Sequence, residues 1–130
     1  MILLDTHIWI WWVNGSSHLS KKKLNLITKA AEKGIAISAI SIWEVAKLVE
    51  KEKLQLSIPV RDWIYKAVLV TGVKVIPLTV DIIVNSTQLK GTFHNDPADQ
   101  IIVATANTIE IPVMTNDKKI LNYPYVKVIK

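Results

Sequence analysis

Four acidic residues follow short apolar segments at separate places in the chain, and they are the residues best suited to chemistry. They are Asp5, Glu44, Asp99 and Asp117. Converging carboxylates repel one another, which raises their pKa values and destabilises a fold unless a cation lies among them. The chain has no cysteine, and histidine is not near most of these acids in the sequence, so we expect an all-oxygen ligand set, which favours Mg²⁺ or Mn²⁺. Such ions typically catalyse phosphoryl chemistry by activating water and neutralising the developing charge.

The same acids also suit the first turns of helices, where an acid accepts backbone N–H groups and stabilises the helix dipole. The candidates for this purely structural role are Asp5, Asp96, Asp99 and Asp117. Ser41 and Glu44 have the Ser-x-x-Glu spacing of a capping box, which alone would account for Glu44. Taken singly, each acid is therefore better explained as part of a helix start than as a catalytic group.

The elements that would position these acids alternate between apolar strands and helices. Strands are predicted at 1–4, 35–37, 73–76, 112–114 and 126–129. Helices are predicted at 8–13, 21–33, from 41 onward, and at 59–70, 79–89, 96–108 and 118–121. This alternation predicts an α/β domain with a mostly parallel central sheet and helices on both faces. Four predicted strand-to-helix junctions each carry an acid, and we expect all four at the carboxyl edge of the sheet, where sites lie in such folds.

Length and charge narrow the class of protein. The chain has 130 residues, which fits a single domain over 1–130. Its formal net charge of +5 allows a polyanionic partner. Arg61 is the only arginine, so we expect attraction to phosphates rather than a base code. No signal peptide and no apolar stretch of about 18 residues is visible, so we expect a cytoplasmic protein with no membrane span.

Four blocks of sequence, in this order, resemble the PIN domain family. They are Leu3-Leu4-Asp5-Thr6-His7, the segment Ser38 to Glu44, the segment His94 to Ala106, and Thr115-Asn116-Asp117. Within that family they look most like the VapC-type toxins of prokaryotic toxin–antitoxin modules. The resemblance implies a three-layer α/β/α sandwich, Mg²⁺- or Mn²⁺-dependent endoribonuclease activity, dimerisation, and neutralisation by a cognate antitoxin.

The resemblance also assigns roles to individual residues. It carries the acids of the family's active site onto Asp5, Glu44, Asp99 and Asp117. Asp96 matches an additional acid of one branch, and Gln100 stands where that branch usually has arginine, which puts a salt bridge or phosphate contact in doubt. Thr6 and Asn116 are expected to hold waters or to orient the carboxylates.

The resulting hypothesis is a metal-dependent endoribonuclease, the toxin of a toxin–antitoxin pair, that hydrolyses RNA with metal-activated water. Asp5 and Asp99 would be the principal ligands of the ion. Two alternatives stay open: a related metal nuclease or phosphatase acting on DNA or a small phosphate ester, and a non-enzymatic module that binds nucleic acid or protein and uses the acids only as caps.

Histidines and tryptophans near the proposed site need separate interpretation. His7 and His94 could protonate a leaving group, but a structural hydrogen bond to a loop backbone is the favoured role. The tryptophans at 9, 11 and 12 are expected to fill the core or a partner surface rather than to stack on bases. Trp43 is expected to pack rather than to bind.

Overall fold

A four-stranded parallel sheet forms the centre of the protein in a computed structural model that describes residues 1–69 and 71–129. The strand order is β3-β2-β1-β4. The strands are β1 (Ile2–Leu4), β2 (Ile35–Ser38), β3 (Lys74–Ile76) and β4 (Val113–Met114). The predicted α/β class with a parallel sheet is confirmed.

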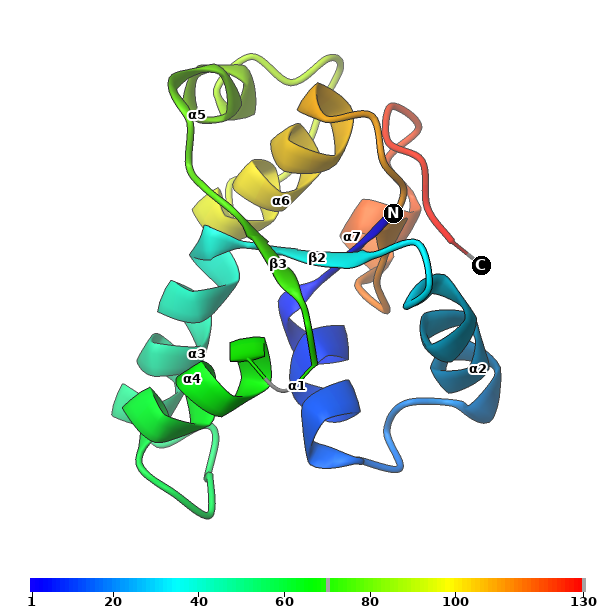
Figure 1. Ribbon diagram of the computed structural model, residues 1–130. Coiled ribbons are helices and arrows are strands. Elements are labelled where there is room, and N and C mark those ends of the chain that lie inside the picture. Colours follow the sequence, from blue (N-terminus) through cyan, green and yellow to red (C-terminus); the bar gives the residue numbers. More distant parts are fainter. Residues whose placement is uncertain (70, 130) are drawn as a thin grey trace.

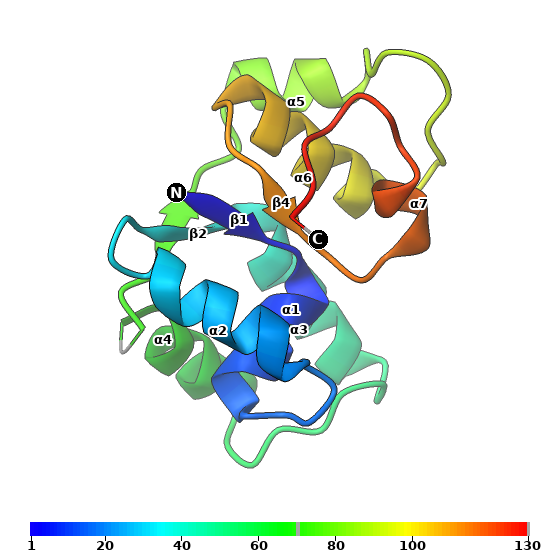
Figure 2. The same cartoon turned by 90° about the vertical axis from the view of Figure 1, so that its right-hand side faces the viewer.

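Helices cover both faces of this sheet and make three layers (Figure 1, Figure 2). One face carries α1 (Thr6–Asn14), α2 (Lys21–Ala30), α3 (Ala39–Glu50) and α4 (Val60–Leu69). The other face carries α5 (Val80–Ser86), α6 (Pro97–Thr108) and α7 (Lys118–Leu121). Among the described residues, none of these helices has the length and apolar character needed to cross a membrane.

Alternating side chains of the central strands divide the core into two halves. Leu4 and Ile37 pack with α1 and α3, whereas Leu3 and Ala36 pack with α6. Successive side chains of a strand point to opposite faces, and every residue of β1 and β2 is buried, which explains why both strands are apolar except for Ser38 at the end of β2. Trp9 is fully buried in the first half, as expected, with its ring 5.2 Å from that of Trp63.

Two predictions about the elements are wrong. The segment 126–129 is not a strand but contributes one parallel bridge, between Val128 and Val113. The two-residue strand β4 offers little length to pair with, which limits the contact to the backbone groups around Val113. Helix α3 begins at Ala39 rather than at Ser41, because β2 runs into it directly.

Removal of the cap of α2 gives a modest stability prediction. Ser20 accepts a hydrogen bond from the backbone N–H of Lys23 at 3.2 Å. Ser20→Ala should lower the free energy of unfolding by about 1 kcal/mol, measured by urea denaturation. Ser17→Ala is the control, because the Ser17 hydroxyl makes no hydrogen bond within the described chain. Equal stability of the two variants would contradict the capping role.

Candidate active site

A cavity of about 330 Å³ lies beyond the carboxyl end of β1, and all the candidate acids line it. Its lining residues are Asp5, His7, Trp11, Glu44, Asp96, Asp99, Asn116 and Asp117. They come from the ends of β1 and β4, from α1 and α3, and from the start of α6. The structure therefore brings the four proposed site acids together, and adds Asp96 and Asn116 to the same wall.

Asp5 is the most deeply buried of these acids, with 6% of its surface exposed. It caps α1, and its Oδ1 accepts the backbone N–H of Thr6 at 2.7 Å. Its Oδ2 accepts the hydroxyl of Thr115 at 2.6 Å. Burial raises the pKa of Asp5, and these two hydrogen bonds oppose the rise. Asp5 is therefore both a cap and a cavity-lining carboxylate held in one orientation.

Glu44 does not form the capping box that its spacing predicts. Ser38 caps α3 instead, accepting the backbone N–H of Ile40 at 3.1 Å, so Ser41 and Glu44 lie inside the helix. Thr6 donates its hydroxyl proton to Glu44 Oε1 at 2.5 Å, and its Oγ1 lies 2.8 Å from the Ser41 hydroxyl, which must then donate to it. The structural explanation for Glu44 is lost, and its carboxylate faces the cavity.

The environment of Glu44 favours its neutral form. Burial raises its pKa to about 7, although the hydrogen bond from Thr6 lowers it, and the charges of Asp5 and Asp96 add to the rise. A carboxyl group with such a pKa can exchange a proton near neutral pH.

The start of α6 supplies two further acids. Asp96 caps the helix by accepting the backbone N–H of Asp99 at 3.1 Å, as predicted. Asp99 lies in the first turn, and burial followed by the charges of the neighbouring acids raises its pKa to about 8. A loop after α5 leads into α6, as the predicted elements have it, so the expectation that all four acids lie at strand-to-helix junctions is wrong at this position. The helix nevertheless directs its first turn at the same cavity.

Thr115 is a supporting residue to which the sequence analysis gave no role of its own. It is fully buried after β4, donates its hydroxyl to Asp5, and accepts the backbone N–H of Asp117 at 2.9 Å. Asp117 in turn caps α7, accepting the N–H of Lys119 at 2.8 Å. A threonine two residues before a capping acid is the available signal, because its hydroxyl can bond the backbone two residues on.

Asn116 and Thr6 differ in what they contact. Thr6 lies against Glu44, whereas the exposed Asn116 lines the cavity and accepts a hydrogen bond from the Lys23 ammonium of α2. Gln100 donates to the backbone carbonyl of His94 at 2.9 Å and so holds the loop before α6. The amide at 100 thus makes a structural contact where an arginine would place a charge.

His94 lies closer to the acids than the sequence analysis expected. Its Nε2 is buried 3.0 Å from Asp99 Oδ2, yet the two are out of line and the nitrogen has no hydrogen-bond partner among the described residues. One ligand atom each from His94, Asp99 and Asp117 lies within 4.8 Å of the others. An unpartnered buried nitrogen between two carboxylates fits a divalent cation, so the group can hold a metal ion with one nitrogen and two oxygens. The candidate metal ligands, which were expected to be oxygen atoms only, therefore include a histidine nitrogen.

Comparison with known proteins places this arrangement in a family. The family model described as PIN domain matches residues 2–124. The chain is 34% identical over 122 residues to the protein named Ribonuclease VapC22 of Mycobacterium tuberculosis, covering 94% of this chain and 91% of that one.

Solved structures share the fold over nearly the whole chain. VapBC2 from Rickettsia felis bound to a promoter DNA fragment has a TM-score of 0.73 at 20% identity, with 99% of this chain and 98% of that chain covered. A toxin–antitoxin complex from Klebsiella pneumoniae has a TM-score of 0.68 at 23% identity, with 100% and 97% covered. The sequence match over almost the full length therefore shows that this chain belongs to the PIN domain family.

Proposed function

We propose that this protein is a Mg²⁺- or Mn²⁺-dependent endoribonuclease and the toxin of a toxin–antitoxin pair. One observation carries the proposal: five carboxylates line one cavity, although their mutual repulsion destabilises the metal-free fold. Such an arrangement is retained where a cation neutralises it. The similarity to a protein named Ribonuclease VapC22 supports RNA as the substrate.

The residues that would hold the ion are Asp99, Asp117 and His94, with Asp5 and Glu44 completing the shell directly or through water. A bound divalent ion would make water acidic and would offset the charge that develops on a phosphodiester in the transition state. The chain keeps its ligands in place by hydrogen bonds: both oxygens of Asp5 and one oxygen of Glu44 are already fixed by Thr6 and Thr115.

Glu44 is the residue that we assign to proton transfer. Its Oε1 is occupied by the Thr6 hydroxyl, which leaves Oε2 to take a proton from an attacking water. Burial raises its pKa to about 7 in the metal-free protein. A bound cation would lower this pKa, so the carboxylate would be ionised and able to accept a proton. Asp5 holds its own oxygens in hydrogen bonds and is better suited to orienting the ion than to exchanging protons.

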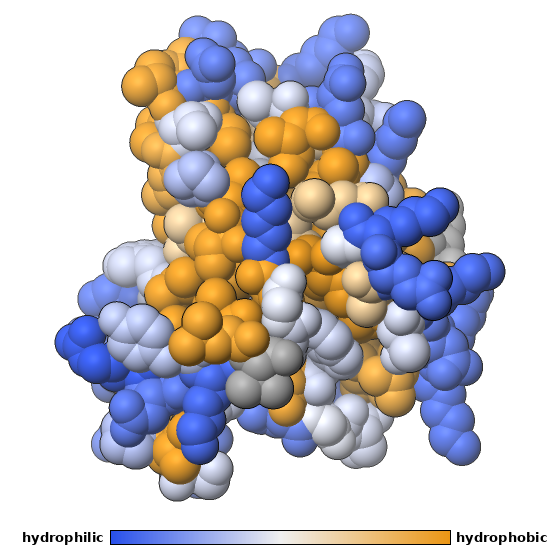
Figure 3. All heavy atoms as spheres, viewed as in Figure 1, coloured by the Kyte–Doolittle hydropathy of each residue, from blue (hydrophilic) through white to orange (hydrophobic). Residues whose placement is uncertain are grey.

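Partner proteins are proposed from an apolar surface. Figure 3 shows hydrophobic side chains gathered over α5 and around the open edge of the sheet at β3, where they surround a strongly hydrophilic side chain, whereas the surface over α4 is mixed. The large exposed apolar residues of α4, of α5 and of the segment that leads into α5 are Tyr65, Leu69, Leu78, Val80, Ile83 and Val84. Large exposed apolar side chains gathered on one face are typical of protein-interaction sites. A second copy of the chain and a cognate antitoxin are the proposed partners, and the cytoplasm is the proposed location.

The test is cleavage of RNA, single-stranded DNA and a small phosphate ester, each with Mg²⁺, with Mn²⁺ and with EDTA. We expect metal-dependent cleavage of RNA, and a loss of at least about 100-fold in Asp5→Asn and Asp99→Asn. Asp62→Asn is the matched control, because Asp62 is likewise an acid in the first turn of a helix but is exposed on α4. Cleavage of DNA instead of RNA would identify a different nuclease, and equal activity in all variants would exclude the mechanism.

A further inference from the structure

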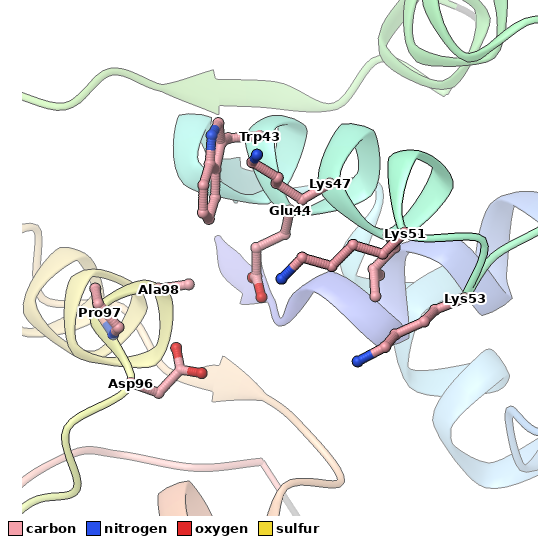
Figure 4. Close-up of a pocket in the computed structure, with 9 residues that line it drawn as sticks. Trp43, Glu44, Lys47, Lys51, Lys53, Asp96, Pro97 and Ala98 are labelled. Carbon is pink, nitrogen blue, oxygen red and sulfur yellow. The ribbon is translucent and has the colours of Figure 1, made fainter.

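A second hollow lies directly beside the acid cavity. Its volume is about 240 Å³, and Figure 4 shows it between α3 and the start of α6. Its lining residues are Trp43, Glu44, Lys47, Leu48, Lys51, Lys53, Asp96, Pro97 and Ala98. We call this hollow the lysine groove. Glu44 and Asp96 line both spaces, so the groove opens onto the proposed site of cleavage.

One wall of the groove is a single face of α3. Trp43 and Lys47 are four residues apart and therefore lie above one another on the helix, and Lys51 follows at the same spacing as the C-cap of α3. The expectation that Trp43 packs in the protein is wrong, because 54% of its surface is exposed. The Lys47 ammonium lies 5.9 Å from the Trp43 ring centroid and 2.9 Å from Glu50, so Lys47 is already engaged and supports the ring.

The end of α3 turns a further lysine into the same groove. Glu52 adopts a left-handed conformation with φ of 58°. The Lys53 N–H then bonds to the carbonyl of Leu48 at 2.8 Å, and the Glu52 N–H to that of Val49 at 3.0 Å, which is the Schellman pattern of a helix end. The chain reverses there, and Lys51 and Lys53 both point into the groove while Asp96 lies on the opposite wall (Figure 4).

The two lysines carry unpaired charge. Across residues 1–69 and 71–129, neither Lys51 nor Lys53 has a carboxylate within 4.0 Å, and both side chains are exposed. The acid cavity next to them repels a polyanion, so a strand of nucleic acid needs positive charge close by to approach it. Two free ammonium groups next to an exposed indole match the two chemical parts of a nucleotide chain, phosphate and base.

We propose that the lysine groove binds single-stranded RNA next to the phosphate that is cleaved, with Lys51 and Lys53 on two backbone phosphates and Trp43 stacked on one base. The assignment of RNA rests on the function proposed above. A base can reach the indole only when it is unstacked, which selects a single strand or a loop over a duplex.

The test measures binding of a fluorescent single-stranded RNA to the metal-free protein over a series of salt concentrations. The double variant K51Q/K53Q should bind more weakly, and its log–log salt slope should be shallower by about 1.4, since each phosphate contact contributes about 0.7. The variant K29Q/K33Q is the control, because it removes the same charge from exposed positions on and just after α2. If both double variants show the same salt slope as the wild type, the proposal is overturned.

Stacking is tested separately. Trp43→Ala should weaken RNA binding by roughly 5- to 150-fold, whereas Trp43→Phe, which keeps an aromatic face, should retain most of the affinity. Equal loss in the two variants would exclude stacking. Competition by an acidic peptide as effective as that by RNA would assign the groove to a protein partner and overturn the proposal.

Cleavage kinetics separate this proposal from the proposed function. With Mg²⁺ present, K51Q/K53Q should raise KM for RNA and leave kcat nearly unchanged, because the lysines bind substrate and transition state alike. If the wild type cleaves RNA but the variants show no change in KM or affinity, the proposal for the lysine groove fails and the proposed function stands. If RNA binding depends on the lysines but the wild type does not cleave RNA, the proposed function fails and the proposal for the lysine groove stands.

Discussion

Replacement of Asp99 by asparagine should abolish cleavage and, at the same time, stabilise the metal-free protein. Asparagine has nearly the same shape but no charge, so it removes first the cost of burying a charge and then the repulsion that Asp5, Asp96, Asp117 and Glu44 exert on this position. The first-turn interaction of Asp99 with the helix dipole is also lost, at about 0.3–1 kcal/mol. We expect the relief of repulsion to exceed this loss, because Asp99 is the acid on which the most charges converge.

The gain in stability should depend on pH in a defined direction. The pKa of Asp99 is about 8 in the folded protein, against an ordinary value of 3.8. A raised folded pKa means that the unfolded chain loses its proton first, so the native state of the wild type loses stability as pH rises from about 4 to about 8. Below that window the carboxyl is neutral in both states. The free energy of unfolding of Asp99→Asn should therefore equal that of the wild type near pH 3–4 and exceed it by a growing margin up to pH 8.

Thermal melting in EDTA at pH 4 to 9 measures this difference. Water screens the partly buried group, so we expect a gain of about 1–2 kcal/mol at pH 8, which is several degrees in Tm. Asp62→Asn should show no such trend, because Asp62 is exposed. Addition of Mn²⁺ should reverse the order, since an ion at 100 times its Kd adds about 2.7 kcal/mol to the protein that binds it. A variant less stable than the wild type at every pH would contradict the repulsion argument.

The sequence predicts most of the sheet because its signals are local. The runs that became β1 and β2 are apolar at every position, which only strands buried on both faces require. The caps at Asp5, Asp96 and Asp117 are likewise confirmed, since each depends on residues within three positions. These caps do not compete with a role in the site, because a carboxylate that accepts a backbone N–H still has free lone pairs facing the cavity.

The parts that the sequence does not predict depend on distant contacts. Glu44 fits a capping box by spacing, but β2 passes directly into α3 and moves the cap to Ser38. The partners of Glu44 and Asp5 then come from Thr6, Ser41 and Thr115, of which Thr115 is 110 positions from Asp5. No local pattern encodes such a pairing. The exposure of Trp43 is also set by tertiary structure, because it depends on which face of α3 the sheet covers.

Among the residues that hold the site acids in place, Thr115 is the one whose loss should most clearly lower both stability and metal affinity. Its hydroxyl joins the end of β4 to the end of β1 by donating to Asp5 and accepting from Asp117. Thr115→Val keeps the shape but leaves the buried Asp5 oxygen and the Asp117 N–H without this partner. We expect a loss of about 1–3 kcal/mol in the free energy of unfolding.

The same change should weaken Mn²⁺ binding by about 10- to 100-fold, because the loss of a group that orients a metal ligand typically lowers metal affinity by that factor. Calorimetric titration of Mn²⁺ measures the affinity, and Thr115→Ser should restore it because the hydroxyl is kept. Thr105→Val is the matched control: Thr105 is also fully buried, but its hydroxyl donates to the carbonyl of Ile101 within α6. If Thr115→Val binds Mn²⁺ as tightly as Thr105→Val does, the Thr115 hydroxyl stabilises the fold but does not support metal binding. The Thr6 N–H would then be enough to orient Asp5.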